Sequence, residues 1–155
     1  MHGHSLLRHM LAVAAVLAIG LLAGVPGARA GGYTGKGHAV EGVVVGVRGA
    51  KVRLDGVLAP ADDRTCPGRD GMAMSCADAS RQALDALLAR GPVTCETKKK
   101  VGHGSYIGAC HMDDGTDVAE AQVAAGWALA AGDAYRDAMS KAEAAGLGAW
   151  GPSTD

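Results

Sequence analysis

The four cysteines are the residues whose chemistry follows most directly from their number and spacing. Cys66, Cys76, Cys95 and Cys110 are separated by nine, eighteen and fourteen residues, so no two of them form a C-x-x-C pair. Zinc sites are usually built from such close pairs, whereas an even set of cysteines is typical of a disulfide framework in a chain that carries an export signal, as the first thirty residues predict. The sequence therefore predicts two disulfides and no metal centre at these residues.

The histidines and tryptophans give weaker signals. Beyond the first thirty residues the histidines are His38, His103 and His111, and they are too dispersed in the chain to indicate a metal site. Trp127 and Trp150 could stack on a ligand, but packing in the core or between helices is the favoured interpretation.

The first thirty residues, Met1–Ala30, predict a secretory signal. The apolar run Met10–Gly24 is shorter than the roughly 20 residues that a membrane-spanning helix needs. Ala28 and Ala30 supply small residues at positions −3 and −1 of a cleavage site, so we expect the mature protein to begin at Gly31. These features predict a secreted or periplasmic protein with no membrane span after the signal is removed.

The charge and residue composition of the chain disfavour some classes of binding partner. The chain has 155 residues and a formal net charge of −1, and its first thirty residues contain two arginines and no acid. The remainder is therefore mildly acidic, which disfavours general binding to nucleic acid or to an anionic membrane. The chain has no Phe, so its core must be built mainly from Val, Leu, Ala and Met and is expected to depend on disulfides.

The pattern of apolar residues and turn signals predicts one domain. We expect a flexible lead-in over 31–37, a domain over 38–151 and a short tail over 152–155. The expected elements are strands of a meander over 38–58, a loop over 60–71, a helix from Ser75 to Gly91, strands at 93–97 and 106–112 joined by a hairpin loop over 98–104, and helices from Asp117 to Gly126 and from Asp133 to Ala145.

The order of these elements predicts the fold class. Five strands with a helix inserted after the third match a small Greek-key barrel of the oligonucleotide/oligosaccharide-binding (OB) type. We therefore expect a mainly β, α+β protein, a five-stranded OB-fold barrel with about three helices. We expect it to be a monomer.

Hairpin geometry predicts which cysteines pair. If strands 93–97 and 106–112 face each other about a loop centred near Gly102, residues whose numbers sum to 205 lie opposite each other, as Cys95 and Cys110 do. Cys66 and Cys76 then share the loop before the first helix. This arrangement is one of the three that four cysteines allow.

Three segments also resemble a known family. Arg53–Pro60 resembles the motif R-L-x-G-I-D-A-P, Asp117–Ala128 resembles D-V-x-x-x-x-V-x-x-G-W-A, and Ala142–Trp150 resembles A-E-x-x-A followed by G-x-W. In this order they are similar to the staphylococcal nuclease (thermonuclease) family, an OB-fold with appended helices. The resemblance covers about residues 38–150, and the cysteine pattern is similar to that of secreted members.

The resemblance implies a catalytic set that this chain has mostly lost. Nucleases of the family hold calcium with aspartates, use a glutamate as general base and bind the scissile phosphate with two arginines. The metal aspartates are replaced by Val43 and Leu58, the base by Ala61 and the second arginine by Ser105, so only Arg53 matches. Calcium needs six to eight oxygen ligands, and loss of a general base removes about 10²–10⁴ in rate.

Three acids near these positions, Glu41, Asp62 and Asp63, could in principle replace the lost groups, but we do not expect them to be placed for it. We therefore expect no bound calcium or other cofactor and no nuclease activity, so that the protein is a pseudoenzyme. Arg53 is either a remaining phosphate ligand or a structural arginine paired with an acid on a strand.

The resemblance also places a basic segment near the former active site. Lys98, Lys99, Lys100 and His103 could bind an anion together with Arg53, although a solvated hairpin tip is the favoured interpretation. Three functions follow from these observations. The first is a secreted module that binds an unidentified ligand or envelope partner, not nucleic acid; the others are an active metal-dependent nuclease of DNA or RNA, and a structural envelope protein.

Overall fold

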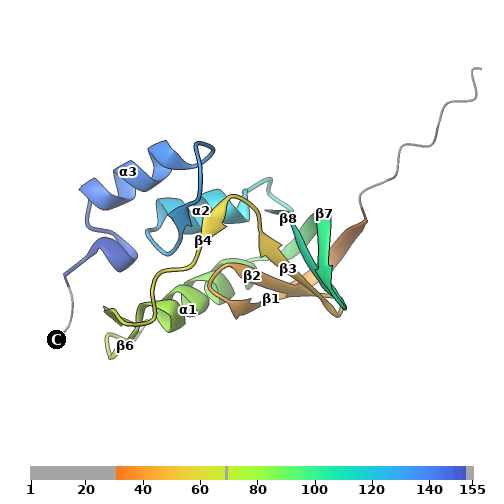
Figure 1. The fold of residues 1–155 in the computed structure, drawn as a ribbon. Helices are drawn as coiled ribbons and strands as arrows, with labels where there is room; N and C mark the ends of the chain where they lie inside the picture. The colour runs from red at the N-terminus through yellow and green to blue at the C-terminus, as the bar shows by residue number, and fades with distance from the viewer. Residues whose placement is uncertain (1–30, 69, 153–155) are drawn as a thin grey trace, which may run out of the picture.

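The structure, a computed structural model, describes residues 31–68 and 70–152 and contains a closed five-stranded barrel with helices beside it (Figure 1). The barrel strands are β1 (Gly32–Glu41), β2 (Val44–Val47), β3 (Ala50–Leu54), β7 (Pro92–Gly102) and β8 (Ser105–Met112). They close in the order β1-β2-β3-β8-β7, and only the β3–β8 pair is parallel. The predicted fold class, a mixed α+β protein with an OB-like barrel, is confirmed.

Alternation of side chains explains how the meander folds. In β3 the side chains of Val52 and Leu54 are buried, whereas those of Lys51 and Arg53 are exposed on the outer side. Positive φ angles of 47° at Arg48 and 81° at Gly49 make the tight turn between β2 and β3. The inward residues of the strands and the apolar faces of the helices form one cluster, which we call the main core.

The lead-in expected at 31–37 is mostly strand, which corrects that prediction. Residues 32–36 pair with β7 from Gly32 opposite Glu96 to Lys36 opposite Pro92, and this pairing closes the barrel. The glycines of this segment indicated mobility, but Gly37 is buried where a Cβ atom would lie 2.8 Å from a methyl group of Val93. That glycine is therefore needed for close packing.

Three helices follow the predicted positions. Helix α1 (Cys76–Leu88) is capped by Ser75, whose hydroxyl accepts a hydrogen bond from the Asp78 amide. Helix α2 (Val118–Ala124) begins after its cap Asp117. Helix α3 (Arg136–Ala144) is shorter than expected, because the residues from 133 to 135 form a turn before it. The two helices α2 and α3 lie together at one end of the barrel (Figure 1).

Two short ladders and a single helical turn complete the fold. Strand β4 (Val57–Leu58) pairs with β9 (Leu129–Ala130), and β5 (Thr65–Pro67) pairs with β6 (Ala73–Ser75), so the loop expected at 60–71 contains part of a small sheet. A 3-10 turn, η1 (Gly148–Trp150), follows α3.

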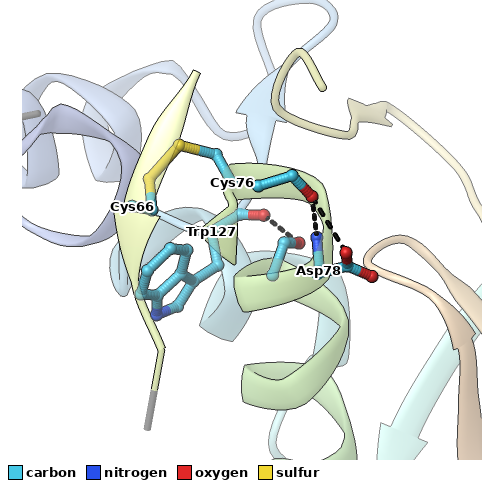
Figure 2. The surroundings of a disulfide bond; sticks show 6 residues. Cys66, Cys76, Asp78 and Trp127 are labelled. Atoms are coloured by element: carbon cyan, nitrogen blue, oxygen red, sulfur yellow. Dashed lines mark hydrogen bonds between the residues drawn. A yellow bond between two sulfur atoms is a disulfide. The ribbon is translucent and has the colours of Figure 1, made fainter. Parts of the chain in front are cut away.

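The structure contains both predicted disulfide pairs. Cys95 and Cys110 lie directly opposite each other on β7 and β8 and are buried in the main core. The Cys66–Cys76 disulfide joins β5 to the start of α1 (Figure 2). Around it is a separate group, which we call the second cluster: Cys66, Cys76, Ala79 and Ala149, with Met74 and Trp127 packed against them.

The hairpin that carries the three lysines is longer than expected. Strand β7 continues to Gly102, so Lys98–Lys100 lie on a strand and the turn is confined to His103 and Gly104. Register shifts between Thr97 and Lys99 and again between Lys100 and Gly102 each place one extra residue on β7. The sum rule that pairs Cys95 with Cys110 therefore fails beyond Thr97.

The predicted export signal, Met1–Ala30, lies outside the described residues, as do residues 153–155 of the expected tail. Pro152, the first residue of that tail, is exposed. Across residues 31–68 and 70–152, no helix combines the length and apolar character needed to cross a membrane.

Candidate functional site on the barrel surface

Arg53 is placed on the outer side of β3 and is paired with an acid. Its guanidinium lies 3.2 Å from a carboxylate oxygen of Glu41, and the two side chains are 50% and 56% exposed. Of the three acids considered from the sequence, Glu41 is thus beside Arg53. Asp62 and Asp63 are exposed after β4, and no ion pair in the described part of the chain links either of them to Arg53.

The four replaced positions have very different environments. Val43 is fully buried in the main core, whereas Leu58 is 58% exposed. Ala61 is exposed, and Ser105 is half-buried with its hydroxyl directed to the His103 carbonyl. None of these side chains can supply a carboxylate oxygen. In the described residues, no group of three or more His, Cys, Asp and Glu side chains is arranged to hold a metal ion.

A row of paired residues crosses all five strands. In strand order the row consists of Glu41, Val44, Arg53, Ile107 and Lys99. Val44 is buried in the main core, whereas Glu41, Arg53 and Lys99 are exposed. Lys51 lies two residues before Arg53 on the same side of β3, opposite Ser105. Residues paired across neighbouring strands project to the same side of a sheet. Lys51, Arg53 and Lys99 therefore share one surface, which we call the outer basic face.

Only part of the basic set predicted from the sequence meets at this surface. Lys99 and Arg53 do, on either side of Ile107. Lys100 belongs to the next pair along the ladder, opposite Tyr106, and therefore lies on the other side of the strand. His103 lies in the turn. His38 and His111 lie on β1 and β8, so the three histidines remain separated.

Lys98 is neutralised by a partner. Its ammonium donates a hydrogen bond of 2.8 Å to Asp55, which follows β3. This hydrogen bond lowers the pKa of Asp55 and raises the pKa of Lys98. Both side chains are largely exposed, so the pair contributes little to stability. Lys98 is consequently less available to an anion than Lys51 or Lys99.

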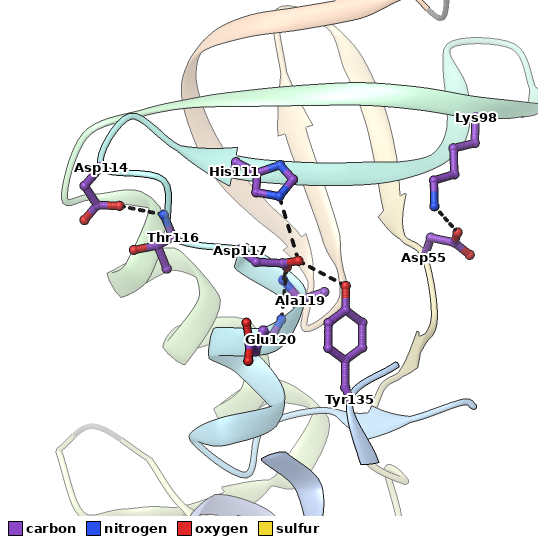
Figure 3. Close-up of polar contacts among 9 residues, drawn as sticks. All are labelled: Asp55, Lys98, His111, Asp114, Thr116, Asp117, Ala119, Glu120 and Tyr135. Carbon is purple, nitrogen blue, oxygen red and sulfur yellow. Dashed lines mark hydrogen bonds and ion pairs between the residues drawn. The ribbon is translucent and has the colours of Figure 1, made fainter. Parts of the chain in front are cut away.

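A second polar cluster centres on Asp117, at the start of α2 (Figure 3). One carboxylate oxygen accepts hydrogen bonds from the Ala119 and Glu120 amides. The other accepts a 3.1 Å hydrogen bond from the Tyr135 hydroxyl and lies 3.8 Å from His111 Nε2. Burial, followed by the charge of Asp117, raises the pKa of Tyr135 to about 12. Tyr135 is therefore a protonated donor at neutral pH.

From the sequence alone, Asp117 predicts only the start of a helix. The cluster joins the ends of β8, α2 and α3. Its hydrogen bonds cap the start of α2 and link it to Tyr135, the residue before α3. The sequence signal that could have revealed it is the cap residue Asp117 together with Tyr135, a large aromatic residue immediately before a helix.

Taken together, the fold and site define a disulfide-bonded barrel protein of the OB-like class with a partly neutralised basic outer surface. No protein-family model matches the chain. The chain is similar to the protein named Succinoglycan biosynthesis protein ExoI from Rhizobium meliloti (strain 1021), with 30% identity over 127 residues. The match covers 75% of this chain and 63% of the relative, so it spans less than two thirds of that protein's length.

Proposed function

We propose that this protein is an exported, staphylococcal nuclease-like OB-fold protein that binds an anionic glycan on its outer basic face and does not hydrolyse nucleic acid. The observation that carries this proposal is the state of the one matched catalytic residue. Arg53 is retained, but it is paired with Glu41, while the positions that would hold metal ligands carry buried Val43 and exposed Leu58. A single carboxylate beside an arginine cannot provide the ligands that calcium requires.

The outer basic face suits weak, repeated contacts to a charged polymer. Lys51 and Lys99 are exposed and make no ion pair within the described residues, and Ile107 lies between Lys99 and Arg53. Lysine and arginine pair with carboxylate or phosphate groups, and an aliphatic side chain can contact the apolar face of a sugar. The name of the relative refers to succinoglycan biosynthesis, which supports a glycan as the ligand.

Export is the second part of the proposal. Two disulfides among the described residues fit an oxidising compartment, in agreement with the signal expected at Met1–Ala30. Intact-mass measurement of protein purified from its native envelope should give a chain that begins at Gly31. A full-length, membrane-retained species would contradict it.

Binding to glycans of matched length tests the ligand class. An alginate oligosaccharide, which carries carboxylates, should bind more tightly than neutral dextran, and added salt should weaken only the former. The double variant Lys51→Gln, Lys99→Gln should bind alginate at least tenfold more weakly, the equivalent of about 1.4 kcal/mol. The control Lys36→Gln, Lys141→Gln removes the same charge elsewhere and should bind normally. Equal binding of alginate and dextran would refute the proposal.

One observation favours the alternative nuclease function, namely the approach of Glu41 to Arg53. DNA and RNA should nevertheless survive prolonged incubation with or without millimolar calcium. Calcium should also leave the melting temperature unchanged, because an ion that binds the native state must stabilise it. Calcium-dependent cleavage that disappears in Arg53→Ala would establish the nuclease instead. A protein that neither cleaves nor binds any glycan would support the structural envelope role.

A further inference from the structure

A cavity of about 130 Å³ lies on the helical side of the molecule and shares no residue with the outer basic face. Its walls come from the segment after β4, the end of α2, strand β9 and η1. The lining residues are Pro60, Ala61, Arg64, Gly126, Leu129, Ala149 and Trp150. Such a small volume, below the roughly 300–1,000 Å³ of sites for drug-sized ligands, suits an end group rather than a whole chain.

The walls of this cavity are held in place by close backbone contacts. The Ala149 amide donates a 2.9 Å hydrogen bond to the Gly126 carbonyl. A Cβ atom at Gly126 would collide with the backbone of Leu147, so the end of α2 and η1 touch directly. In the segment after β4, the Arg64 carbonyl accepts a 2.8 Å hydrogen bond from the amide of disulfide-bonded Cys76. The site is therefore formed before any ligand arrives.

The lining combines an apolar surface with one positive charge. Trp150 and Leu129 are partly buried, and Leu58, paired with Leu129 across the β4–β9 ladder, extends the apolar surface outward. Arg64 is the charged lining residue, and its guanidinium has no ion pair within residues 31–68 and 70–152. Arg64 is exposed at this cavity, and a lining that includes an arginine and a tryptophan suits a carboxylate attached to a ring or a short carbon chain.

We propose that this cavity binds a carboxylate-bearing end group of a glycan. The carboxylate pairs with Arg64, and the carbon skeleton packs on Trp150 and Leu129. The choice of a glycan rests on the proposed function, whereas the carboxylate and the size limit come from the cavity itself. Two sources share this chemistry: a terminal uronic acid, in which the carboxylate is part of the sugar, and a dicarboxylic acid half-ester attached to a sugar.

Three small probes separate these sources. They are methyl glucuronide, monomethyl succinate and the neutral methyl glucoside, each titrated into the purified, oxidised protein and followed by NMR. The chain has two tryptophans, so its spectrum contains two indole N–H signals that one variant, Trp127→Phe, can assign. At least one carboxylate probe should shift the Trp150 signal and bind at least tenfold more tightly than methyl glucoside. The carboxylate that binds more tightly identifies the source.

Matched variants locate the site. Arg64→Gln should weaken the carboxylate probe at least tenfold, whereas Arg90→Gln, which removes a charge paired with Asp114 on the surface, should not. Equal affinity for the charged and neutral probes, or unchanged affinity in Arg64→Gln, would overturn the cavity proposal. Probe binding lost in the Lys51→Gln, Lys99→Gln variant but kept in Arg64→Gln would also overturn it, while supporting the outer basic face. If the protein does not bind alginate but binds the carboxylate probe in an Arg64-dependent way, only the proposal for the outer basic face is refuted.

Discussion

The main core and the second cluster each contain one disulfide, but they are held together in different ways. In the main core the bond joins Cys95 to Cys110, residues that already face each other in a hydrogen-bonded ladder of a closed barrel. In the second cluster the bond joins Cys66 to Cys76, and little else surrounds it than a three-residue ladder, two alanines, Met74 and Trp127.

Because of this difference, we expect global stability to depend on the main core and the shape of the candidate ligand cavity to depend on the second cluster. Apolar burial scales with the size of a core, so the barrel can maintain its structure through its valines and leucines, whereas a small cluster requires a covalent constraint. Ala149 belongs to the second cluster and also lines the cavity. We therefore expect changes in the main core to affect the global free energy of unfolding, and changes in the second cluster to affect ligand binding and local protection.

The largest effect should come from placing a charge in the main core. Val43→Asp, which introduces the residue type that the resemblance to the nuclease family implies here, puts a carboxylate where Val43 is fully buried. Without a partner it should lower the free energy of unfolding by about 3–5 kcal/mol. Leu58, the second position that the resemblance implies, is 58% exposed, so Leu58→Asp should change the free energy of unfolding by less than about 0.5 kcal/mol. Urea denaturation measures both.

Equal losses in these two variants would remove the distinction between a buried and an exposed replacement. If the expected difference is observed, any variant that places an acid at Val43 carries the cost of a charge in the barrel interior, whatever is changed at the exposed positions.

Removal of the main-core disulfide should give the next largest effect. The bond closes a loop with a sequence separation of 15, for which the chain-entropy model gives about 3 kcal/mol. Cys95→Ala with Cys110→Ala also leaves space among buried side chains, so the total loss should be about 3–4 kcal/mol. The barrel should still form, and circular dichroism should retain its native β signal. A loss of that signal would show that the bond is required for folding.

Removal of the second-cluster disulfide should have a smaller effect on the global free energy of unfolding and a larger effect on local opening. The loop is shorter, with a sequence separation of 10, and Cys66→Ala with Cys76→Ala should lower the free energy of unfolding by about 2–3 kcal/mol. Trypsin should then cleave after Arg64 faster than in the wild type, because the wall that holds this residue opens locally. Faster cleavage at Arg64 in the Cys95, Cys110 variant as well would contradict the separation of the two regions.

Local signals in the sequence predicted the barrel and its disulfides well. The cap at Ser75, the turn at Arg48-Gly49 and the facing of Cys95 and Cys110 all depend on neighbouring residues or on a single hairpin. The closing of the barrel could not be read in the same way. Gly32–Lys36 pairs with a strand about sixty residues away, and nothing in its glycine-rich composition identifies that partner.

The candidate site was predicted only in part. Arg53 and Lys99 do share a surface, but the register shifts after Thr97 decide which lysines face outward, and such shifts have no clear sequence signal. The pairing of Lys98 with Asp55 and the cavity beside Arg64 likewise depend on contacts between distant segments. The sequence favours packing for Trp150, and the structure shows it partly buried in the wall of that cavity.

A buried polar residue at the junction of the two regions should give an intermediate effect. The Gln122 amide donates hydrogen bonds of 2.9 Å and 3.2 Å to the Gly42 and Ser80 carbonyls, and the Ser80 hydroxyl donates one of 2.6 Å to the Trp127 carbonyl. Gln122→Leu leaves two buried carbonyls without these donors and should lower the free energy of unfolding by about 1–3 kcal/mol. It should also speed hydrogen exchange in both regions, whereas an effect confined to one region would show that Gln122 does not couple them.

The smallest effect should come from Tyr135, which packs against the main core while its hydroxyl reaches Asp117. Burial and the charge of Asp117 raise the pKa of Tyr135 from 10.0 to about 12, so the folded state holds the phenolic proton more tightly than the unfolded chain does. Between these two values the folded state binds more protons, and stability should therefore fall as the pH rises from 10.0 to about 12. Tyr135→Phe should remove this dependence and, at neutral pH, lower the free energy of unfolding by only about 0.5–1.5 kcal/mol through the lost hydrogen bond.

Absorbance titration of the tyrosines checks the origin of the pKa shift of Tyr135. Asp117→Asn should lower the pKa of Tyr135 but leave it above 10.0, since burial remains; a return to 10.0 would mean that the Asp117 charge alone causes the shift.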